Sequence, residues 1–315
     1  MNYTTLEGAL NLFAKIARAT GNQFRAAAYG RAIVATRMSH GDAELARSQI
    51  GDDVRAKIAE YNATGHIREL DELLAQQSTR AALEFDTILG FGPASIRALI
   101  ARGIYTRAQL TDAAQHRAVK LTHMQDIGLR YYDDLHRTIP RATITRVAEV
   151  IIAEIYRASP HAMIEIAGSY RRRLPQSNDI DILVASRGEA TGTLLREVHE
   201  NIRALDRAGI TFVDIVALGK SKYSFIVRTS EQIMSVDIIL VAQSEFWAAL
   251  LHFTGSQLFN IWLRELCKKN GFSLSQYGLR DLRTGEMINL ESEEHIFRLM
   301  GVPFIEPSRR DGIGS

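Results

Sequence analysis

The chain has 315 residues, of which 46% are hydrophobic and 23% are charged, and its formal net charge is +2. This length predicts about two domains, and the composition excludes collagen-like, low-complexity and largely disordered proteins. The sequence shows no apolar run long enough to cross a membrane and no apolar leader. We therefore expect an intracellular protein without membrane association, in the nucleus, the cytoplasm or a viral particle. The one cysteine, Cys267, excludes an internal disulfide.

The first half of the sequence has a helical pattern. Leu6, Leu10 and Phe13 recur at the spacing of one helix face, and residues 24–38 continue in the same style. Two segments share a further pattern, in which a tight turn that contains glycine is followed by a helix, and the helix ends at another glycine. The glycines of this repeat are Gly51 in residues 50–67, and Gly90, Gly92 and Gly103 in residues 90–104.

Such a helix–hairpin–helix directs backbone N–H groups and a helix N-terminus outward, where they favour a phosphate group. It can therefore hold a DNA backbone without reading its sequence. An ordinary pair of antiparallel helices also needs glycine at its turn, so the repeat alone favours DNA binding only slightly. Because the net charge is small, binding of nucleic acid must rest on local sites of this kind.

The second half changes to short β-branched and apolar runs that alternate with helical patterns. Strand candidates are residues 163–167, 179–184, 212–218, 223–228 and 235–241, and helix candidates are residues 142–158 and 191–207. We expect a mixed sheet covered by helices, followed after residue 245 by a small helical and mixed tail.

Three aspartates in this half indicate a metal site. Asp179 and Asp181 stand two residues apart on one predicted strand, so their side chains share a face, and Asp237 lies in a strand that could pair alongside. Convergent carboxylates repel one another unless a cation neutralises them, and their oxygens suit Mg²⁺. Two such ions can stabilise both the attacking and the leaving oxygen of a phosphoryl transfer. The alternative is a strand end with solvated acids.

A turn of phosphate-binding character precedes the first two aspartates. In the run GSYRRRLPQSNDIDILV, Gly168 permits close backbone approach, the Ser169 hydroxyl can bond a phosphate oxygen, and residues 171–173 supply three arginines. The alternative is a solvated basic turn. A Gly-Ser turn about ten residues before a D-x-D pair favours a bound triphosphate.

This arrangement resembles the nucleotidyltransferase superfamily. The motif HFTGS at residues 252–256, the segment 259–277 and the ending 303–310 narrow the resemblance to the family X DNA polymerases, over nearly the whole chain. The resemblance implies a multi-domain α+β fold, with an all-helical N-terminal half that carries two helix–hairpin–helix motifs and then a nucleotidyltransferase palm with a mixed sheet. The implied domains are a lyase-like helical domain (1–80), a duplex-DNA-binding helical subdomain (81–145), the catalytic palm (146–245) and a nucleotide-selecting fingers subdomain (246–315).

The resemblance also assigns roles near the metals. Asp179, Asp181 and Asp237 match the three catalytic aspartates that bind two Mg²⁺ ions, for which Mn²⁺ can substitute. Ser169 and Arg172 match residues that grip the incoming triphosphate. The full set of candidate substrate-binding residues is Gly168, Ser169, Arg172, His252, Phe253, Gly255, Asn260 and Arg264.

Further roles fall on the C-terminal part of the chain. Asn260 would touch the base, Arg264 would reach the template strand, and Phe253 would line the pocket with Tyr277. His252 stands where the family often has a tyrosine beside the sugar. The candidate DNA-binding residues are Gly51, Gly90, Gly92, Gly103 and Tyr277.

Lys57 matches the lysine that forms a Schiff base in the 5′-deoxyribose-phosphate lyase of the family. Imine formation needs a neutral amine, so a lyase role requires a Lys57 pKa that is lowered by burial or by neighbours. Tyr29, Arg25 and Arg55 could flank it and hold a 5′-phosphate, whereas Asp53 replaces a basic residue of related enzymes. The alternative is a solvated or phosphate-contacting lysine.

The leading hypothesis is a DNA-directed DNA polymerase that fills short gaps in base excision repair. Its partners would be gapped or primer-template DNA and deoxynucleoside triphosphates, and it would act as a monomer. The short segment 229–234 favours template-dependent synthesis, and departures from the family pattern at Ser235, Gln257 and Gln276 predict lower fidelity. Two alternatives stay open: a nucleotidyltransferase that acts on RNA ends or small molecules, and a non-catalytic DNA-binding relative.

Overall fold

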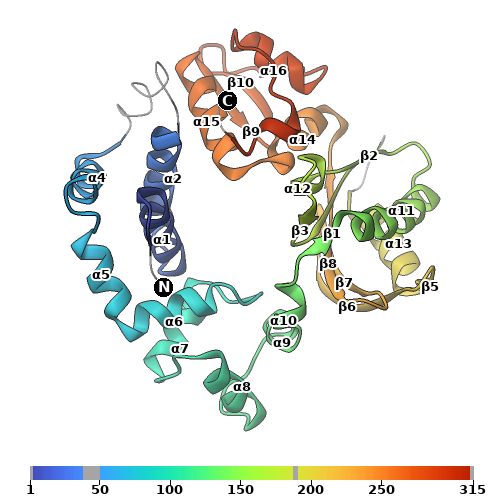
Figure 1. Ribbon diagram of the computed structural model, residues 1–315. Helices are drawn as coiled ribbons and strands as arrows, with labels where there is room; N and C mark the ends of the chain where they lie inside the picture. Colours follow the sequence, from blue (N-terminus) through green and yellow to red (C-terminus); the bar gives the residue numbers. More distant parts are fainter. Residues whose placement is uncertain (1–2, 38–49, 187–190, 313–315) are drawn as a thin grey trace. The chain divides into compact units, whose positions relative to one another are not determined.

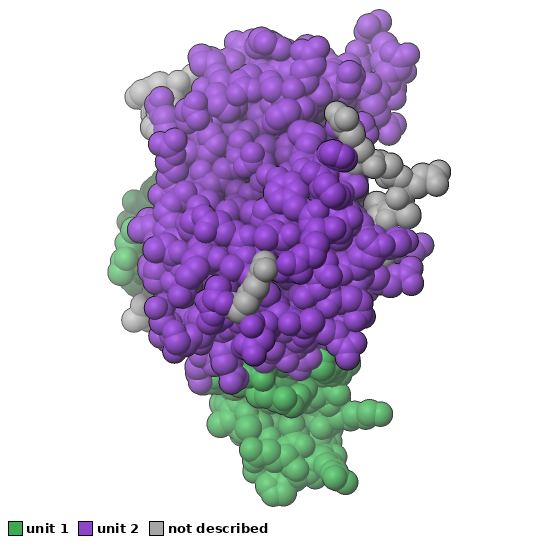
Figure 2. Space-filling view, turned by 90° about the vertical axis from the view of Figure 1, so that its right-hand side faces the viewer, with its two compact units in different colours: residues 1–132, 314 green, residues 133–313, 315 purple. Residues whose placement is uncertain are grey.

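The computed structural model describes residues 3–37, 50–186 and 191–312, and the chain divides into two compact units. The first unit ends at Tyr132 and the second begins at Asp133, so the division falls before the expected boundary at residue 145 (Figure 2). Within the described residues, the first unit contains helices and turns and no strand. The expectation of an all-helical N-terminal half is therefore confirmed for this part of the chain.

The first unit is built from helices (Figure 1). They are α1 (Leu6–Ala19), α2 (Gln23–Arg37), α4 (Asp52–Thr64), α5 (Arg68–Ala75), α6 (Gln77–Phe85), α7 (Pro93–Ala101), α8 (Arg107–Gln115) and α9 (His123–Arg130), with α10 (Tyr132–Leu135) at the boundary. Helix α1 begins at Thr5, whose side chain accepts a hydrogen bond from the backbone N–H of Gly8. Its buried face packs against α2, where Phe13 stacks on Tyr29 with ring centroids 4.8 Å apart.

The second unit contains the palm and a smaller C-terminal subdomain. The palm elements are β1 (Ile139–Pro140), α11 (Arg141–Ala158), β2 (Met163–Ile166), α12 (Gly168–Arg171), β3 (Gln176–Ser177), β4 (Ile180–Ala185), α13 (Thr191–Arg203), β5 (Asp206–Arg207), β6 (Ile210–Leu218), β7 (Lys222–Arg228) and β8 (Ile233–Val241). The C-terminal elements are η1 (Gln243–Glu245), α14 (Phe246–Thr254), α15 (Gln257–Lys269), β9 (Phe272–Ser275), β10 (Gly278–Asp281), β11 (Met287–Ile288), α16 (Glu293–Leu299) and η2 (Pro307–Arg309).

The palm sheet is mixed, as the sequence predicts. Its strand order is β2-β4-β8-β7-β6-β5, with β4 and β8 parallel and the other neighbours antiparallel. The strands are rich in β-branched residues and nearly all of β4 is buried, because helices cover both faces of the sheet in this region.

Alternation along β4 divides its side chains between two cores. Ile182 and Val184 belong to the core that α11 and α13 complete, whereas Leu183 and Ala185 pack with Ile239 of β8 against α14. Each fully buried aliphatic side chain of this kind contributes roughly 1.5–3 kcal/mol to folding. The C-terminal subdomain is thereby held against one face of the palm sheet. Within the described ranges, none of the helices combines the length and the apolar character that crossing a bilayer requires.

Candidate active site

The register of two parallel strands brings two aspartates side by side. β4 and β8 pair Asp181 with Asp237, and Asp179 lies two residues earlier, in the loop that leads into β4. Because side chains alternate along a strand, Asp181 and Asp237 project from the face that carries Leu183 and Ile239, which is the face that α14 covers. The aspartates therefore lie where the palm sheet meets the C-terminal subdomain.

The carboxylates of these aspartates repel one another. Burial, and then the charges of Asp179 and Asp237, raise the pKa of Asp181 to about 7. Burial, and then Asp237, also raise the pKa of Asp179, although its side chain still reaches solvent. Bound divalent cations relieve repulsion of this kind, so the oxygen donors present here fit Mg²⁺.

Lys222 supplies a positive charge beside the aspartates. Its Nζ lies 2.7 Å from Asp237 Oδ2, and its position on β7, opposite Ile239 of β8, makes this contact possible. The charge of Lys222 lowers the pKa of both Asp179 and Asp181, against the larger effects that raise them. In the described ranges, no group of three or more His, Cys, Asp or Glu side chains is arranged so that it could hold a metal ion. Asp181 and Asp237 thus lie side by side, Asp179 is near enough for its charge to raise the pKa of Asp181, and Lys222 is the ion-pair partner of Asp237.

The turn before the aspartates places glycine against a carboxylate. Gly168 has a φ of +57°, and a Cβ at this position would lie 2.7 Å from Asp181 Oδ2. Both the backbone conformation and the available space therefore require glycine. Ser169 follows in the short helix α12, where its Oγ donates to Ser177 Oγ at 2.5 Å. A hydroxyl and the first amides of α12 are thereby held beside the aspartates.

Two arginines of the same turn reach the C-terminal subdomain. Arg172 Nε donates to both carboxylate oxygens of Asp311, at 2.9 and 3.0 Å, and its Nη1 donates to the Thr254 carbonyl at 2.6 Å. Arg171 donates to Thr254 Oγ1 at 3.0 Å and pairs with Glu293 at 2.6 Å. These contacts join the predicted triphosphate turn to the C-terminal subdomain.

The HFTGS segment forms a second connected group. Asn260 Nδ2 donates to the His252 carbonyl at 2.7 Å, and Arg264 Nη2 donates to His252 Nδ1 at 3.0 Å. Burial, and then the charge of Arg264, lower the pKa of His252, so that its imidazole is neutral at pH 7 and accepts this hydrogen bond. Phe253 packs edge-on against His252 at a centroid distance of 4.9 Å, and Gly255 ends α14. The structure therefore gathers these predicted substrate-binding residues at the end of α14 and the start of α15.

The predicted DNA-binding glycines lie in two turns of the first unit. Gly92 caps α7 and Gly103 follows its end, and a Cβ at either would meet no described atom within 4 Å. Gly90 has a φ of +86° and approaches Gln125, where a Cβ would lie 2.9 Å from the backbone nitrogen. Gly51 caps α4 and is similarly open, whereas the segment before it, residues 38–49, lies outside the described residues. A side chain at Gly92 or Gly103 would thus meet open space, while their N–H groups are used within the unit, since Gly92 donates to Ser95 Oγ and Gly103 donates to the Ile100 carbonyl.

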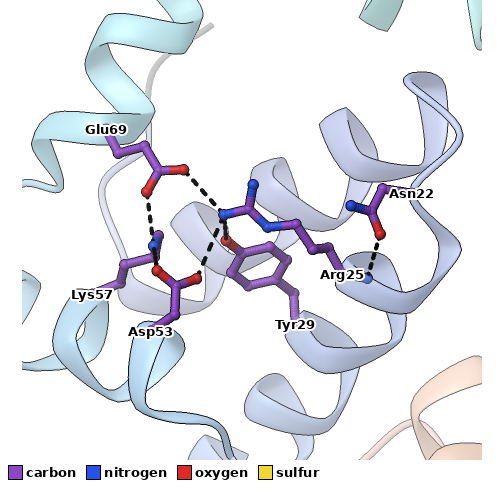
Figure 3. A network of polar contacts seen from close by, with 6 residues as sticks. All are labelled: Asn22, Arg25, Tyr29, Asp53, Lys57 and Glu69. Atoms are coloured by element: carbon purple, nitrogen blue, oxygen red, sulfur yellow. Dashed lines mark hydrogen bonds and ion pairs between the residues drawn. The ribbon is translucent and has the colours of Figure 1, made fainter.

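Lys57 lies in a network of ion pairs (Figure 3). Its side chain is buried, and its Nζ lies 2.5 Å from Asp53 Oδ1 and 2.7 Å from Glu69 Oε2. Arg25 contacts both carboxylates and the Tyr29 hydroxyl. Burial alone would lower the pKa of Lys57, but the hydrogen bonds to Asp53 and Glu69 outweigh it and raise this pKa. The lowered pKa that a lyase role requires is therefore not found in this structure, because two carboxylates surround the amine.

The surroundings of Lys57 match the expectation only in part. Tyr29 and Arg25 flank the cluster, as expected, but Arg55 donates its Nε to the Ile50 carbonyl instead. A cavity of about 510 Å³ opens beside the cluster, and Arg25, Tyr29 and Glu69 contribute to its lining while Lys57 does not. The structure thus holds Lys57 away from the nearest cavity of the first unit.

Contacts between distant segments added residues that the sequence analysis missed. Lys222, Glu69, Thr254 and Asp311 touch predicted site residues, yet each belongs to a segment far from its partner along the chain. No spacing or motif marks Lys222, Glu69 or Asp311, whereas Thr254 lies within the HFTGS motif, which gave no indication of its contact with Arg172. Tyr277, by contrast, was predicted, and the structure places it in the exposed turn between β9 and β10, where it is 61% exposed.

Comparison with protein-family models identifies three successive parts of the chain. The model described as DNA polymerase beta palm matches residues 138–243, and the model described as DNA polymerase beta thumb matches residues 249–311. The model described as the fingers domain of DNA polymerase lambda matches residues 83–136. The C-terminal subdomain, which the sequence analysis names fingers, thus carries the name thumb in this nomenclature.

Curated relatives match across most of the chain. DNA polymerase lambda of Rattus norvegicus is 27% identical over 325 residues, which cover 96% of this chain and 55% of the relative. DNA polymerase lambda of Arabidopsis thaliana is 25% identical, over 94% of this chain and 60% of the relative. DNA nucleotidylexotransferase of Xenopus laevis is 23% identical, over 83% and 58%. The chain spans less than two thirds of the length of these relatives. With fingers, palm and thumb models matched in this order along the chain, and the aspartate pair in the palm, the chain belongs to the family X DNA polymerases.

Proposed function

We propose that the chain is a DNA-directed DNA polymerase that fills short gaps, as base excision repair requires. The observation that carries the proposal is the register that pairs Asp181 with Asp237 directly beside the Gly168–Ser169 turn. Carboxylates at this point can hold cations, and the turn and Arg172 can hold a triphosphate. The names of the curated relatives, two of them DNA polymerases lambda, support the same activity.

Two divalent cations, Mg²⁺ or Mn²⁺, would be held by Asp179, Asp181 and Asp237. When bound, they supply electrostatic stabilisation to the attacking and leaving oxygens of nucleotidyl transfer. Asp237 is the carboxylate that would accept a proton from the primer 3′-hydroxyl. Lys222, whose Nζ lies 2.7 Å from Asp237 Oδ2, places a positive charge beside that carboxylate.

The chain's own groups would hold the nucleotide. Gly168 lets the turn approach the Asp181 carboxylate closely, and the Ser169 hydroxyl and the Arg172 guanidinium can bond phosphate oxygens. The neutral His252 is fixed by Arg264 and can stand against the sugar. These interactions would position the α-phosphorus for attack.

The short connection between β7 and β8 supports template-dependent synthesis. Thr229 N–H donates to the Gln232 carbonyl at 2.9 Å, and this tight turn links the two strands directly. A long loop that could replace a template strand has no room in such a turn. The turns at Gly92 and Gly103, beside which a side chain would meet open space, would lie against the phosphates of the duplex.

Primer extension tests the proposal. Substrates are a one-nucleotide gap with a 5′-phosphate, the same gap without it, and a single-stranded primer, each with Mg²⁺ and with Mn²⁺. We expect extension on the gaps and none on the single strand, and Asp181→Ala should abolish extension while DNA binding persists. Extension by Asp181→Ala would show that the site is assigned wrongly. Efficient extension of the single strand would favour template-independent addition instead.

A further inference from the structure

We propose that Asp311 is a positioning residue for nucleotide binding. It holds the Arg172 guanidinium at the seam between the palm and the C-terminal subdomain, so that the remaining N–H groups of Arg172 are directed to a triphosphate. This inference rests on the proposed function, because it assumes that Arg172 binds phosphate. It concerns a residue that no motif of the sequence marks.

The contacts of Arg172 leave one side of its guanidinium available. Nε donates to both oxygens of Asp311 and Nη1 donates to the Thr254 carbonyl, so two of the three nitrogens are fixed. Among the described residues, none accepts a hydrogen bond from Nη2. The Arg172 side chain is 14% exposed, which limits its movement and still permits contact with a small ligand. A phosphate oxygen can therefore bond Nη2 without breaking the pair with Asp311.

Asp311 extends from a firmly anchored stretch of backbone. The preceding residue, Arg310, is fully buried, lies 2.9 Å from Glu293 and stands over the ring of Phe259 at 5.0 Å. Ser256 Oγ donates to the Arg310 carbonyl at 3.0 Å. Because the backbone next to Asp311 is held in place, its carboxylate is positioned to orient the Arg172 guanidinium.

The opposite side of Arg172 is equally confined. A Cβ on Gly255 would lie 3.4 Å from Arg172 Nη1, so the guanidinium fits closely against the end of α14. Arginine has many rotamers in solution, and a side chain already held in place loses less freedom when it binds phosphate. Asp311 thus acts on nucleotide affinity through Arg172, without contacting the reacting atoms.

A competing role for the same carboxylate makes the opposite prediction. If Asp311 occupied the guanidinium in place of phosphate, a triphosphate would have to displace it, and removing its charge would strengthen binding. We favour positioning because the paired nitrogen is Nε, whereas Nη2 has no acceptor among the described residues. The direction of the change in affinity therefore decides between the two roles.

The test compares Asp311→Asn with Asp311→Glu, and Glu291→Gln serves as the matched control because Glu291 is an exposed acid of the same subdomain. Binding of dATP and of inorganic tripolyphosphate, each with Mg²⁺, is measured by calorimetry, and KM and kcat are measured by extension of a one-nucleotide gap. We expect Asp311→Asn to weaken binding and raise KM about tenfold with kcat nearly unchanged. Asp311→Glu should recover much of the affinity, and Glu291→Gln should leave it unchanged.

Combining Asp311→Asn with Arg172→Ala separates a positioning role of Asp311 from a general structural effect of its replacement. In the Arg172→Ala background, Asp311→Asn should have no further effect on binding, because Asp311 acts through Arg172. Unchanged or tighter binding by Asp311→Asn in the otherwise intact protein would overturn the inference. If the intact protein binds dATP but extends no primer, the proposed polymerase activity fails while the inference is still decided by binding. Failure of the intact protein to bind either triphosphate would overturn both.

Discussion

Two clusters of charged side chains, one in each unit, contain the same kind of contact and differ in their balance of charge. In the palm, three aspartates face one lysine, whereas in the first unit two carboxylates face a lysine and an arginine. The members are Asp179, Asp181, Asp237 and Lys222 in the palm, and Arg25, Asp53, Lys57 and Glu69 in the first unit. A lysine Nζ lies 2.7 Å from a carboxylate oxygen in both.

The consequences for titration are opposite. The palm cluster has surplus negative charge, and the pKa of Asp181 is raised to about 7. In the first unit, charges are matched, and hydrogen bonding to Lys57 lowers the pKa of Asp53. An excess of negative charge, as in the palm cluster, indicates a place where a cation can bind. In the first unit, the carboxylates are already neutralised by the lysine and the arginine of the same cluster. The predictions below test this contrast, from the largest expected effect to the smallest.

Asp181→Asn should lower the rate of gap filling by roughly a thousandfold, because it removes a ligand charge that holds the cations at the reacting phosphate. Single-turnover extension on a one-nucleotide gap measures this rate. DNA affinity should not fall, since the aspartates repel a polyanion when no cation is bound. Asp206→Asn, which changes an exposed acid of the same sheet, should leave the rate intact. An equal loss in both variants would contradict a specific role for the Asp181 carboxylate.

Lys57 should form little covalent adduct with a cleaved abasic substrate, because a protonated and paired amine is a poor nucleophile. Combining Asp53→Asn with Glu69→Gln should raise the yield of borohydride-trapped adduct roughly tenfold for each unit by which the Lys57 pKa falls. Lys57→Ala is the negative control, which measures adduct formed at any other amine. Abundant trapping by the unmodified chain would show that DNA displaces the two carboxylates and that the lyase role holds.

The two clusters should also give opposite slopes of stability against pH. Because the folded-state pKa of Asp181 is raised, the folded chain keeps a proton between about pH 4 and pH 7 that the unfolded chain has released. The free energy of unfolding should therefore fall as the pH rises through this range, by roughly 1 kcal/mol per pH unit at most. Asp53 has a lowered pKa, so its contribution is present above about pH 4 and is lost as the pH falls further.

Urea unfolding in the presence of a chelator, at intervals from pH 4.5 to pH 7.5, measures the first slope. Asp181→Asn should flatten it, and Mg²⁺ should do the same because the cation binds the ionised carboxylates. A slope that Asp181→Asn leaves unchanged would place the titrating group elsewhere.

Replacing the palm lysine should have the smallest effect. Lys222→Met removes a positive charge beside the cation site, so half-maximal extension should need about threefold less Mg²⁺. The effect is modest because the Lys222 side chain is 54% exposed and water screens it. Lys222→Arg, which keeps the charge, should behave like the unmodified chain. A higher Mg²⁺ requirement for Lys222→Met would mean that the lysine supports cation binding.

Local sequence patterns predicted neighbouring strands that carry Asp181 and Asp237, because strand periodicity is a local property, and the register pairs these two residues. Asp179 was predicted on the same strand as Asp181, and the structure places it in the loop before β4. The close backbone approach at Gly168 was predicted for a phosphate, and in the structure the neighbour at this position is the Asp181 carboxylate. The mixed sheet and the helical first half followed from periodicity in the same way.

The partners of these residues could not be predicted, because they depend on contacts between distant segments. Arg172 and Asp311 are 139 residues apart, and Lys222 reaches Asp237 only through the pairing of β7 with β8. The raised pKa of Lys57 has the same cause, since one of its two carboxylate partners, Glu69, belongs to α5. Sequence spacing thus identified the chemical groups, whereas tertiary pairing determined which charges are balanced.

Counting bound Mn²⁺ tests the central claim most directly. The chain is equilibrated with gapped DNA that carries a chain-terminated primer and with the complementary triphosphate, and bound Mn²⁺ is measured by electron paramagnetic resonance. We predict two ions for each unmodified chain and fewer for Asp237→Asn, because the aspartate trio holds the cations. The same number of ions on both proteins would contradict the account.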